Sequence, residues 1–145
     1  MKEDKFVRFI KFYTSLYAKG FQRISNVLAK INRLMFSCDI PSSVVIGSNL
    51  HLPHYGLGVV LHPKTTIGND CVIYQNVTIG VKHRGDGEAS FFIKDGALIG
   101  AGAVILGRGL MTIGANSVIG GGAVVLSSLP DNSIAVGNPA KIINK

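Results

Sequence analysis

The sequence predicts an all-β fold, a parallel β-helix of hexapeptide repeats, with a short α-helical arm at its N-terminus. From Ile93 to Val125 a branched aliphatic residue returns about every six positions, and a small residue follows four positions later. This period fits neither an α-helix nor an ordinary strand, but it fits a triangular coil with one flat side per hexapeptide. Composition agrees, because 47% hydrophobic and 16% charged residues suit a continuous aliphatic spine.

Residues 1–37 are expected to form a basic amphipathic helical arm. Apolar residues follow the i, i+3, i+4 spacing of a helical face, and Gly20 is expected to divide or bend the helix. Residues 1–36 hold eight Lys/Arg and two acidic residues, or +6 of the total charge of +7. The basic character therefore belongs to the arm, so no nucleic-acid partner is expected for the β-helix.

The arm has two open interpretations. It can pack on the end of the β-helix or on sister subunits, or residues 1–36 can contact an anionic membrane peripherally. The aromatic residues of its first half fit either surface; they are Phe6, Phe9, Phe12, Tyr13 and Tyr17.

The predicted β-helix domain spans residues 38–145, and its period fails at defined places. The first break, from Leu52 to Leu61, has nine residues instead of six. A polar second break predicts a loop over residues 81–92, extruded from a corner where insertions cost least. Residues 129–145 are expected to turn away and cap the stack.

Function is expected where the period fails, because a packed aliphatic core is chemically inert. His54 lies in the first break between Pro53 and a Gly-rich bend, on a stiff backbone. Imidazole titrates near neutral pH, which suits a general base that takes a proton from a hydroxyl. His51 and His62 are weaker candidates, since ordinary turn or surface histidines explain them. His83 lies in the predicted loop and could contact a neighbour's site.

No metal is expected, because His51, His54 and His62 lack the spacing of a helical pair and no carboxylate lies between them. A zinc site assembled between subunits stays an alternative. Cys38 and Cys71 form no CxxC pair, which suits a reducing cytoplasm. No run of about 18 apolar residues is present. A cytoplasmic protein is expected, with a possible peripheral place on the inner membrane face.

Five motifs carry a resemblance to a known family: Leu52-Pro-His54-Tyr-Gly, Ile73-Tyr-Gln-Asn-Val-Thr-Ile79-Gly, Ile99-Gly-Ala-Gly-Ala-Val-Ile105-Leu-Gly, Ile119-Gly-Gly-Gly-Ala-Val-Val and Val136-Gly-Asn-Pro-Ala-Lys141. In order and spacing they resemble the serine acetyltransferase branch of the hexapeptide acyltransferases. Those enzymes are left-handed β-helices that use acetyl-CoA. The resemblance implies a homotrimer with sites between its subunits.

The resemblance also implies roles for single residues. His54 would be the general base of an O-acetyltransferase that uses acetyl-CoA as co-substrate and no metal. Tyr55 and His83 would contact the acceptor. The CoA arm would follow a groove of small residues, with a basic residue near its phosphates. The CoA-binding residues would be Ala101, Gly121, Ser127 and Lys141.

Two departures from the family pattern bear on the acceptor. Pro53 precedes His54, where serine acetyltransferases carry Asp, and residues 89–91 read Ala-Ser-Phe, where their loop ends in Arg-His-Pro. A zwitterion such as serine would lose charge-assisted hydrogen bonds, each worth roughly 1.5–3 kcal/mol. The Leu-Pro-His-Tyr-Gly form is more similar to short relatives that O-acetylate sugars in capsule or exopolysaccharide assembly.

We therefore expect a saccharide hydroxyl of surface polysaccharide biosynthesis, on a small or lipid-linked molecule, as the acceptor. Serine, as in cysteine biosynthesis, is the alternative acceptor. A non-catalytic or zinc-dependent β-helix protein is the further alternative.

Overall fold

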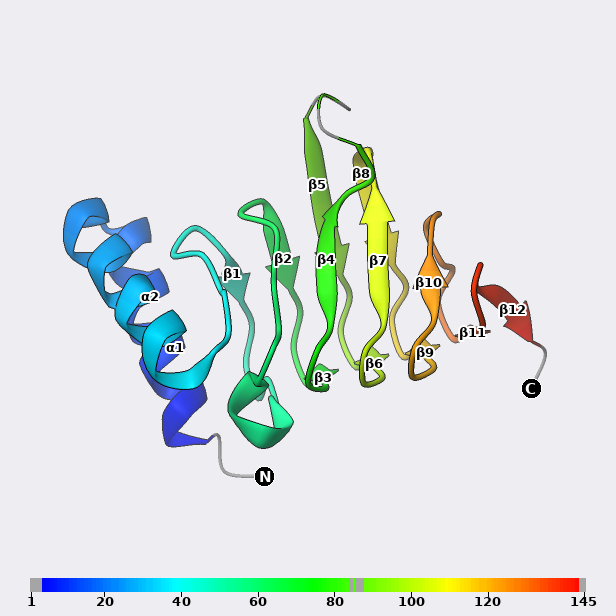
Figure 1. Ribbon diagram of the computed structural model, residues 1–145, viewed down its shortest axis with the longest axis horizontal. Helices are drawn as coiled ribbons and strands as arrows, with labels where there is room; N and C mark the ends of the chain where they lie inside the picture. The colour runs from blue at the N-terminus through cyan, green and yellow to red at the C-terminus, as the bar shows by residue number, and fades with distance from the viewer. Residues whose placement is uncertain (1–3, 84, 86–87, 144–145) are drawn as a thin grey trace.

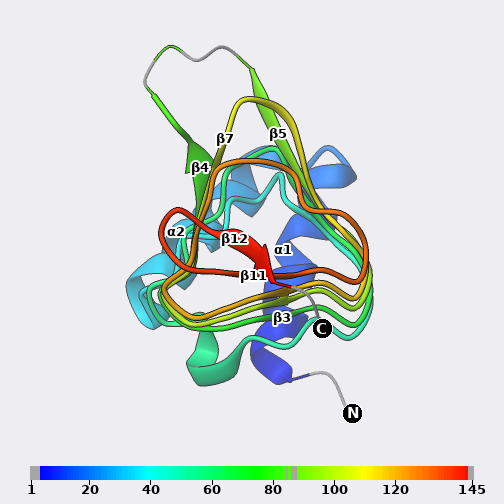
Figure 2. The same cartoon turned by 90° about the vertical axis from the view of Figure 1, so that its right-hand side faces the viewer.

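The structure, a computed structural model, describes residues 4–83, 85 and 88–143. Two helices cover one end of a column of stacked coils, and the C-terminus lies at the other end (Figure 1). Seen along the column, the coils superimpose as a triangle (Figure 2). The predicted parallel β-helix with a short helical arm is confirmed.

Three sheets form the sides of the triangle. Sheet I holds, in spatial order, β1 (Val45–Ile46), β2 (Thr65–Ile67), β5 (Ala89–Ile93) and β8 (Gly109–Ile113). Sheet II holds β4 (Thr78–Val81), β7 (Val104–Gly107) and β10 (Val124–Val125). Sheet III holds β3 (Val72–Ile73), β6 (Leu98–Ile99), β9 (Val118–Ile119), β11 (Ile134–Val136) and β12 (Lys141–Ile143). All neighbours are parallel except β11 and β12.

The core is the aliphatic spine that the hexapeptide period predicts. In sheet III, Ile73 stands in register with Ile99, and Ile99 with Ile119. The inward isoleucines are all at most 1% exposed: Ile67, Ile73, Ile79, Ile93, Ile99, Ile105, Ile113 and Ile119. Because each coil repeats the inward residue of the last, the column buries one continuous apolar core.

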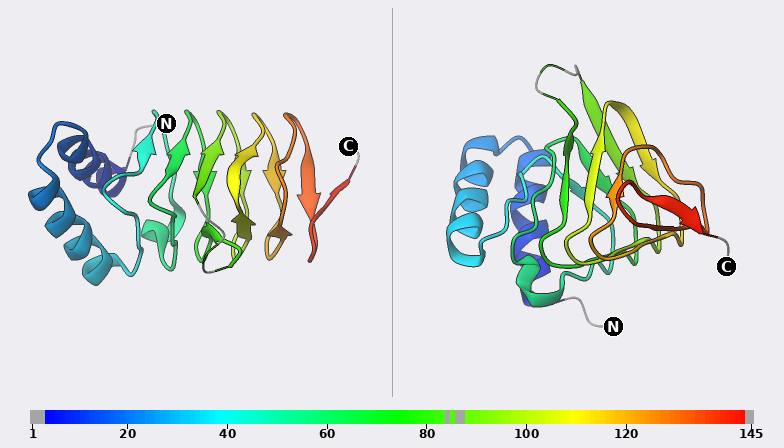
Figure 3. Two further views of the ribbon diagram at one scale, coloured as in Figure 1. Left: turned by 90° about the horizontal axis from the view of Figure 1, so that it is seen from above. Right: turned by 45° about the vertical axis from the view of Figure 1, so that its right-hand side comes forward.

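The helical arm packs on the first coil. Helices α1 (Lys5–Ala18) and α2 (Gln22–Phe36) are separated at Gly20, which has φ +92°. Helix α1 lies against the coil and buries Phe6 and Tyr13, and the Tyr13 hydroxyl donates to the Ile40 carbonyl at 2.9 Å. Phe6 and Tyr13 therefore cannot contact a lipid surface, contrary to that interpretation of the arm. Helix α2 is the outermost element at this end (Figure 3).

The extruded loop is shorter than residues 81–92, and part of it, residues 84, 86 and 87, lies outside the described residues. Strand β5 takes up residues 89–92, where Ala89 and Phe91 are buried. It pairs along its whole length with β8, where the chain carries two extra residues. Strands β5 and β8 are therefore longer than the other strands of sheet I, and their residues Ala89, Phe91 and Met111 point into the core.

The C-terminal residues close the column. Strand β11 stacks on β9, and β12 turns back to pair antiparallel with β11. No helix in the described part of the chain has both the length and the apolar character needed to cross a bilayer.

Candidate functional site

The first break in the period forms a turn at the edge where sheet III passes into sheet II. This turn is a 3-10 segment, η1 (Pro53–Gly56). The later coils turn the same edge at residues 74–77, 100–103 and 120–123. We call this edge of the column, from η1 to residue 123, the histidine corner.

Backbone hydrogen bonds stack the turns of the histidine corner. Asn76 N–H donates to the Leu57 carbonyl at 2.8 Å, which joins the second coil to the first. Gly102 donates to Gln75 at 3.0 Å, and Gly122 donates to Ala101 at 2.8 Å. The edge is therefore a rigid column that runs from the histidine turn to the fourth coil.

His54 is presented outward on a constrained backbone. Its φ and ψ are 56° and 34°, in the left-handed region that few non-glycine residues adopt. The side chain is exposed and makes no hydrogen bond to another described residue. An imidazole held in this way is free to meet a substrate hydroxyl, as a general base requires.

Tyr55 links this turn to the helical arm. Its φ is also 56°, and its side chain is 57% exposed. One side of its ring contacts Phe6, with centroids 5.6 Å apart, and Phe36, at 5.9 Å. Phe6 and Phe36 are themselves 4.7 Å apart. Helices α1 and α2 therefore hold the residue next to His54 in place.

The small residues of the corner leave room for a ligand close to the backbone. A Cβ added at Gly121 would lie 3.3 Å from the Ala101 carbonyl oxygen. Gln75 is the residue equivalent to Ala101 in the preceding coil. Its side-chain Oε1 is buried without a hydrogen-bond partner in the described structure. Sequence reasoning missed Gln75, although a polar side chain among Ala and Gly at equivalent positions was a visible signal.

Lys141 lies at the C-terminal end of the histidine corner. It begins β12 and pairs with Val136, where β11 reaches the corner. The adjoining segment is tied to sheet II, because Val124 N–H donates to the Gly137 carbonyl at 2.9 Å. His54 and Lys141 thus lie at opposite ends of one edge, with Ala101 and Gly121 between them.

Two predicted site residues lie on a different edge. Ser127 follows β10 and His83 follows β4, both where sheet II passes into sheet I. We call this edge the loop corner, because the loop after β4 extends from it (Figure 2). Within one chain, therefore, the structure does not bring Ser127 or His83 to His54.

The surroundings of the other two candidate histidines, His51 and His62, are explained by the fold. His51 lies in the backbone ladder, with its N–H donating to Cys71. The Nδ1 of His62 accepts from Lys64 N–H at 3.2 Å, and its ring stands 5.3 Å from Phe91. Burial, and then the charge of Lys64, lower the pKa of His62. In the described part of the chain, no three His, Cys, Asp or Glu residues are grouped to hold a metal ion.

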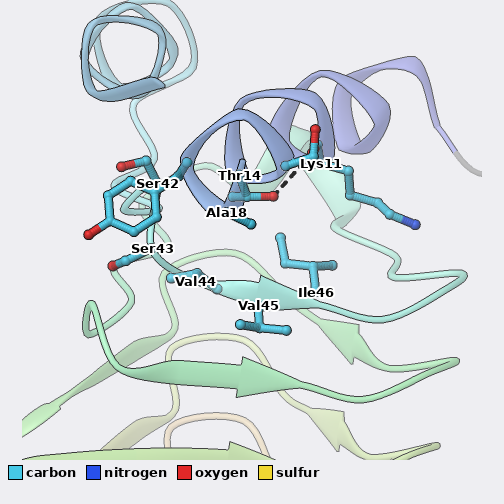
Figure 4. Close-up of a pocket in the computed structure, with 10 residues that line it drawn as sticks. Lys11, Thr14, Ala18, Ser42, Ser43, Val44, Val45 and Ile46 are labelled. Carbon is cyan, nitrogen blue, oxygen red and sulfur yellow. Dashed lines mark hydrogen bonds between the residues drawn. The ribbon is translucent and has the colours of Figure 1, made fainter. Parts of the chain in front are cut away.

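A hollow of about 420 Å³ lies apart from the histidine corner, between α1 and β1. Figure 4 shows Thr14 and Lys11 of α1 above Val45 and Ile46. The Thr14 hydroxyl donates to the Lys11 carbonyl of its own helix at 3.2 Å. None of the predicted site residues lines this hollow.

The chain is similar to known serine acetyltransferases over most of its length, although no family model matches it. The *Bacillus subtilis* enzyme is 35% identical over 129 residues, 89% of this chain and 58% of that protein. A *Helicobacter pylori* enzyme (strain 26695) is 37% identical over 131 residues, 90% of this chain and 75% of that protein.

Solved structures agree. The *Brucella abortus* serine acetyltransferase superimposes with a TM-score of 0.88 at 32% identity, covering 97% of this chain and 56% of that one. The soybean apoenzyme gives 0.87 at 33% identity, covering 95% and 56%. This chain thus spans little more than half the length of these solved relatives and of the *B. subtilis* enzyme. The left-handed β-helix fold implied by the resemblance is confirmed.

These relatives also correct the expected acceptor. Each is a serine acetyltransferase, and none of them is a saccharide-modifying enzyme. The prediction of a polysaccharide O-acetyltransferase is therefore wrong, and the alternative, serine, is the acceptor that the comparison favours. Because the chain is 37% identical over 131 residues to a relative of which it covers 75%, it belongs to the serine acetyltransferase family.

Proposed function

We propose that this protein is a serine O-acetyltransferase that uses acetyl-CoA and whose site lies at the histidine corner. The observation that carries the proposal is the position of His54, Ala101 and Gly121 along one edge of the column. Membership of the family supports the same reaction. Acetyl-CoA supplies the acetyl group as a thioester, and this chain's residues position and deprotonate the acceptor.

His54 acts as the general base. Its exposed imidazole takes the proton from the serine hydroxyl as that oxygen attacks the thioester carbonyl. The new C–O bond forms, the C–S bond breaks, and CoA leaves as the free thiol after its sulfur takes the proton from the imidazolium. General-base help of this kind is typically worth about 10²–10⁴-fold in rate. The left-handed backbone at His54 and the aromatic contacts of Tyr55 constrain the turn that carries the imidazole. We propose that Tyr55, on the open side of its ring, contacts the acceptor.

The small corner residues hold the CoA arm. Ala101 and Gly121 leave the backbone accessible, and a Cβ at Gly121 would enter the space beside the Ala101 carbonyl. Amide groups of the arm can then exchange hydrogen bonds with the backbone at these turns. Lys141, an exposed cation at the end of the same edge, would pair with the phosphates of CoA.

We propose that a homotrimer completes each site. His83 and Ser127 lie on the loop corner, away from His54, so they can contribute only if the loop corner of one subunit meets the histidine corner of the next. His83 would then contact the acceptor and Ser127 the nucleotide end. A cytoplasmic setting fits the free thiols of Cys38 and Cys71.

Release of free CoA thiol tests the reaction. The full chain is incubated with acetyl-CoA and L-serine, and L-alanine, which lacks the hydroxyl, is the matched control. We expect release with L-serine only, with O-acetylserine identified by mass spectrometry. Equal release with both amino acids, or none with serine, would contradict the proposal.

A further inference from the structure

The outer side of helix α2 carries an apolar surface that nothing in the described structure covers. Leu34 is 85% exposed and Met35 is 69% exposed. With Ile24, Val27 and Ile31, which are also exposed, they form what we call the α2 apolar face. Their spacing places them along one side of the helix. Large apolar side chains gathered in this way mark an interaction surface.

The orientation of α2 is fixed by polar residues on its inner side. The buried Ser25 hydroxyl donates to the Tyr13 carbonyl at 2.5 Å, and the buried Asn32 amide donates to the Cys38 carbonyl at 3.3 Å. These bonds tie α2 to α1 and to the start of the first coil. The α2 apolar face therefore stays exposed while the arm is packed.

The charge beside this face selects an anionic occupant. Helix α2 contains no acidic residue, and Arg23 and Lys30 are exposed along the edge of the apolar face. Arg33, the third cation of the helix, pairs with Asp39 at 3.3 Å. In a two-fold antiparallel pair centred on this face, the two Lys30 side chains would lie close together, and no acidic residue of α2 could offset their charges. Like charges at an interface disfavour such pairing.

The place of α2 in the fold suits a flat occupant. It is the outermost element at the N-terminal end of the column, opposite the C-terminus (Figure 3). An open hollow of about 410 Å³ continues from Met35 toward α1, and Phe9, Tyr55 and the oppositely charged pair Asp4 and Lys5 are among its lining residues. In the proposed trimer, three such faces would bind together and strengthen a weak contact.

We propose that the α2 apolar face docks on an anionic lipid surface, with the helix in the membrane plane. The apolar side chains enter the acyl boundary, and Arg23 and Lys30 meet the lipid headgroups. None of the five residues of the α2 apolar face belongs to the histidine corner, so vesicle binding can be measured independently of acetyl transfer.

Vesicle flotation with the full chain tests this proposal. Vesicles of phosphatidylcholine alone are compared with vesicles containing phosphatidylglycerol. We expect binding to the anionic vesicles only, weakened as salt rises from about 0.1 to 1 M. Leu34→Ser should lower the partition coefficient about ten-fold or more, and Arg23→Gln about five-fold.

Matched variants elsewhere on the surface serve as controls. Leu110→Ser removes another exposed leucine, 70% exposed on β8, and Arg108→Gln removes another exposed arginine. Both should bind as the unchanged chain does. Absence of binding to anionic vesicles, or equal loss in the controls, would overturn the proposal. The proposal would also be overturned if light scattering showed that Leu34→Ser dissociates an oligomer of this protein, because a second copy would then cover the α2 apolar face.

Discussion

The first coil and the coils that follow it use the same architecture in different ways. From Ile93 to Val125, each turn of the histidine corner is tight, and hydrogen bonds join it to the turns before and after it. In the first coil the same corner contains the longer turn η1, in which His54 and Tyr55 both have φ 56°. The first coil has the second coil on one side, but on its other side it has helices α1 and α2 instead of another coil.

This difference shows how the fold separates support from chemistry. A regular coil leaves only backbone and small side chains at the corner, which suits a long ligand arm. The irregular coil presents an imidazole, and aromatic packing from α1 and α2 replaces the missing neighbour. Four changes test this division, from the regular core to its periphery.

The largest expected loss of stability follows removal of a spine residue in the regular coils. Ile99 is fully buried between Ile73 and Ile119. Ile99→Ala should lower the free energy of unfolding by about 2–5 kcal/mol, through lost burial and a cavity. Urea unfolding at fixed protein concentration measures it. Val45→Ala, at a position 59% exposed, should change it by less than about 0.5 kcal/mol. A similar loss of unfolding free energy in both variants would contradict the conclusion that the buried isoleucines stabilise the column.

A side chain at the corner should affect the proposed CoA site more than the fold. Gly121→Val places atoms beside the Ala101 carbonyl, 3.3 Å from the new Cβ. If two backbone hydrogen bonds of about 0.5–1.5 kcal/mol each are lost, KM for acetyl-CoA rises roughly ten-fold. Steady-state kinetics should show kcat nearly unchanged. Gly80→Val, where an added Cβ meets nothing within 4 Å, is the control and should leave KM as it is.

Loosening the aromatic contact should affect the irregular coil alone. Phe36→Leu removes a ring that stacks near Tyr55 and Phe6, a contact worth about 0.5–1.5 kcal/mol. We expect kcat to fall roughly five-fold, because the His54 turn is less well held, with KM for acetyl-CoA unchanged. Phe12→Leu, at an exposed position of α1, is the matched variant. An equal fall in kcat for Phe12→Leu would argue against positioning through Tyr55.

The smallest effect concerns His62 and pH. Burial and Lys64 hold its pKa below the ordinary 6.5, so the unfolded chain binds this proton more readily than the folded chain. Stability is therefore retained above pH 6.5 and decreases as the pH falls below it. In His62→Gln this part of the pH dependence should disappear, as thermal unfolding between pH 5 and 7.5 would show. If the stability of His62→Gln still decreased below pH 6.5 as in the unchanged chain, another titratable group would be responsible.

Much of the fold could be predicted because the spine repeats in the sequence. The inward isoleucines, the break around His54 and the division of the arm at Gly20 follow from spacing and from glycine chemistry. Three-dimensional stacking could not be read in the same way. Only the structure shows that Gln75 Oε1 is buried at this corner without a described hydrogen-bond partner, or that Ser127 lies on the loop corner.

The acceptor was predicted wrongly for a physical reason. Residues 89–91 were compared with acceptor-binding positions of a loop, but here they belong to strand β5. Ala89 and Phe91 are buried core residues, and Phe91 packs near His62. The apolar character of Ala89 and Phe91 therefore serves the core of sheet I.

The most direct test of the account is serine-dependent CoA release by His54→Ala. The His54 side chain is exposed and makes no hydrogen bond to another described residue, so the variant should fold, oligomerise and bind acetyl-CoA as the unchanged chain does. We predict that kcat falls by about 10²–10⁴-fold while acetyl-CoA still raises the melting temperature. A His54→Ala protein that retains full turnover with L-serine would contradict the assignment of the histidine corner as the site of acetyl transfer.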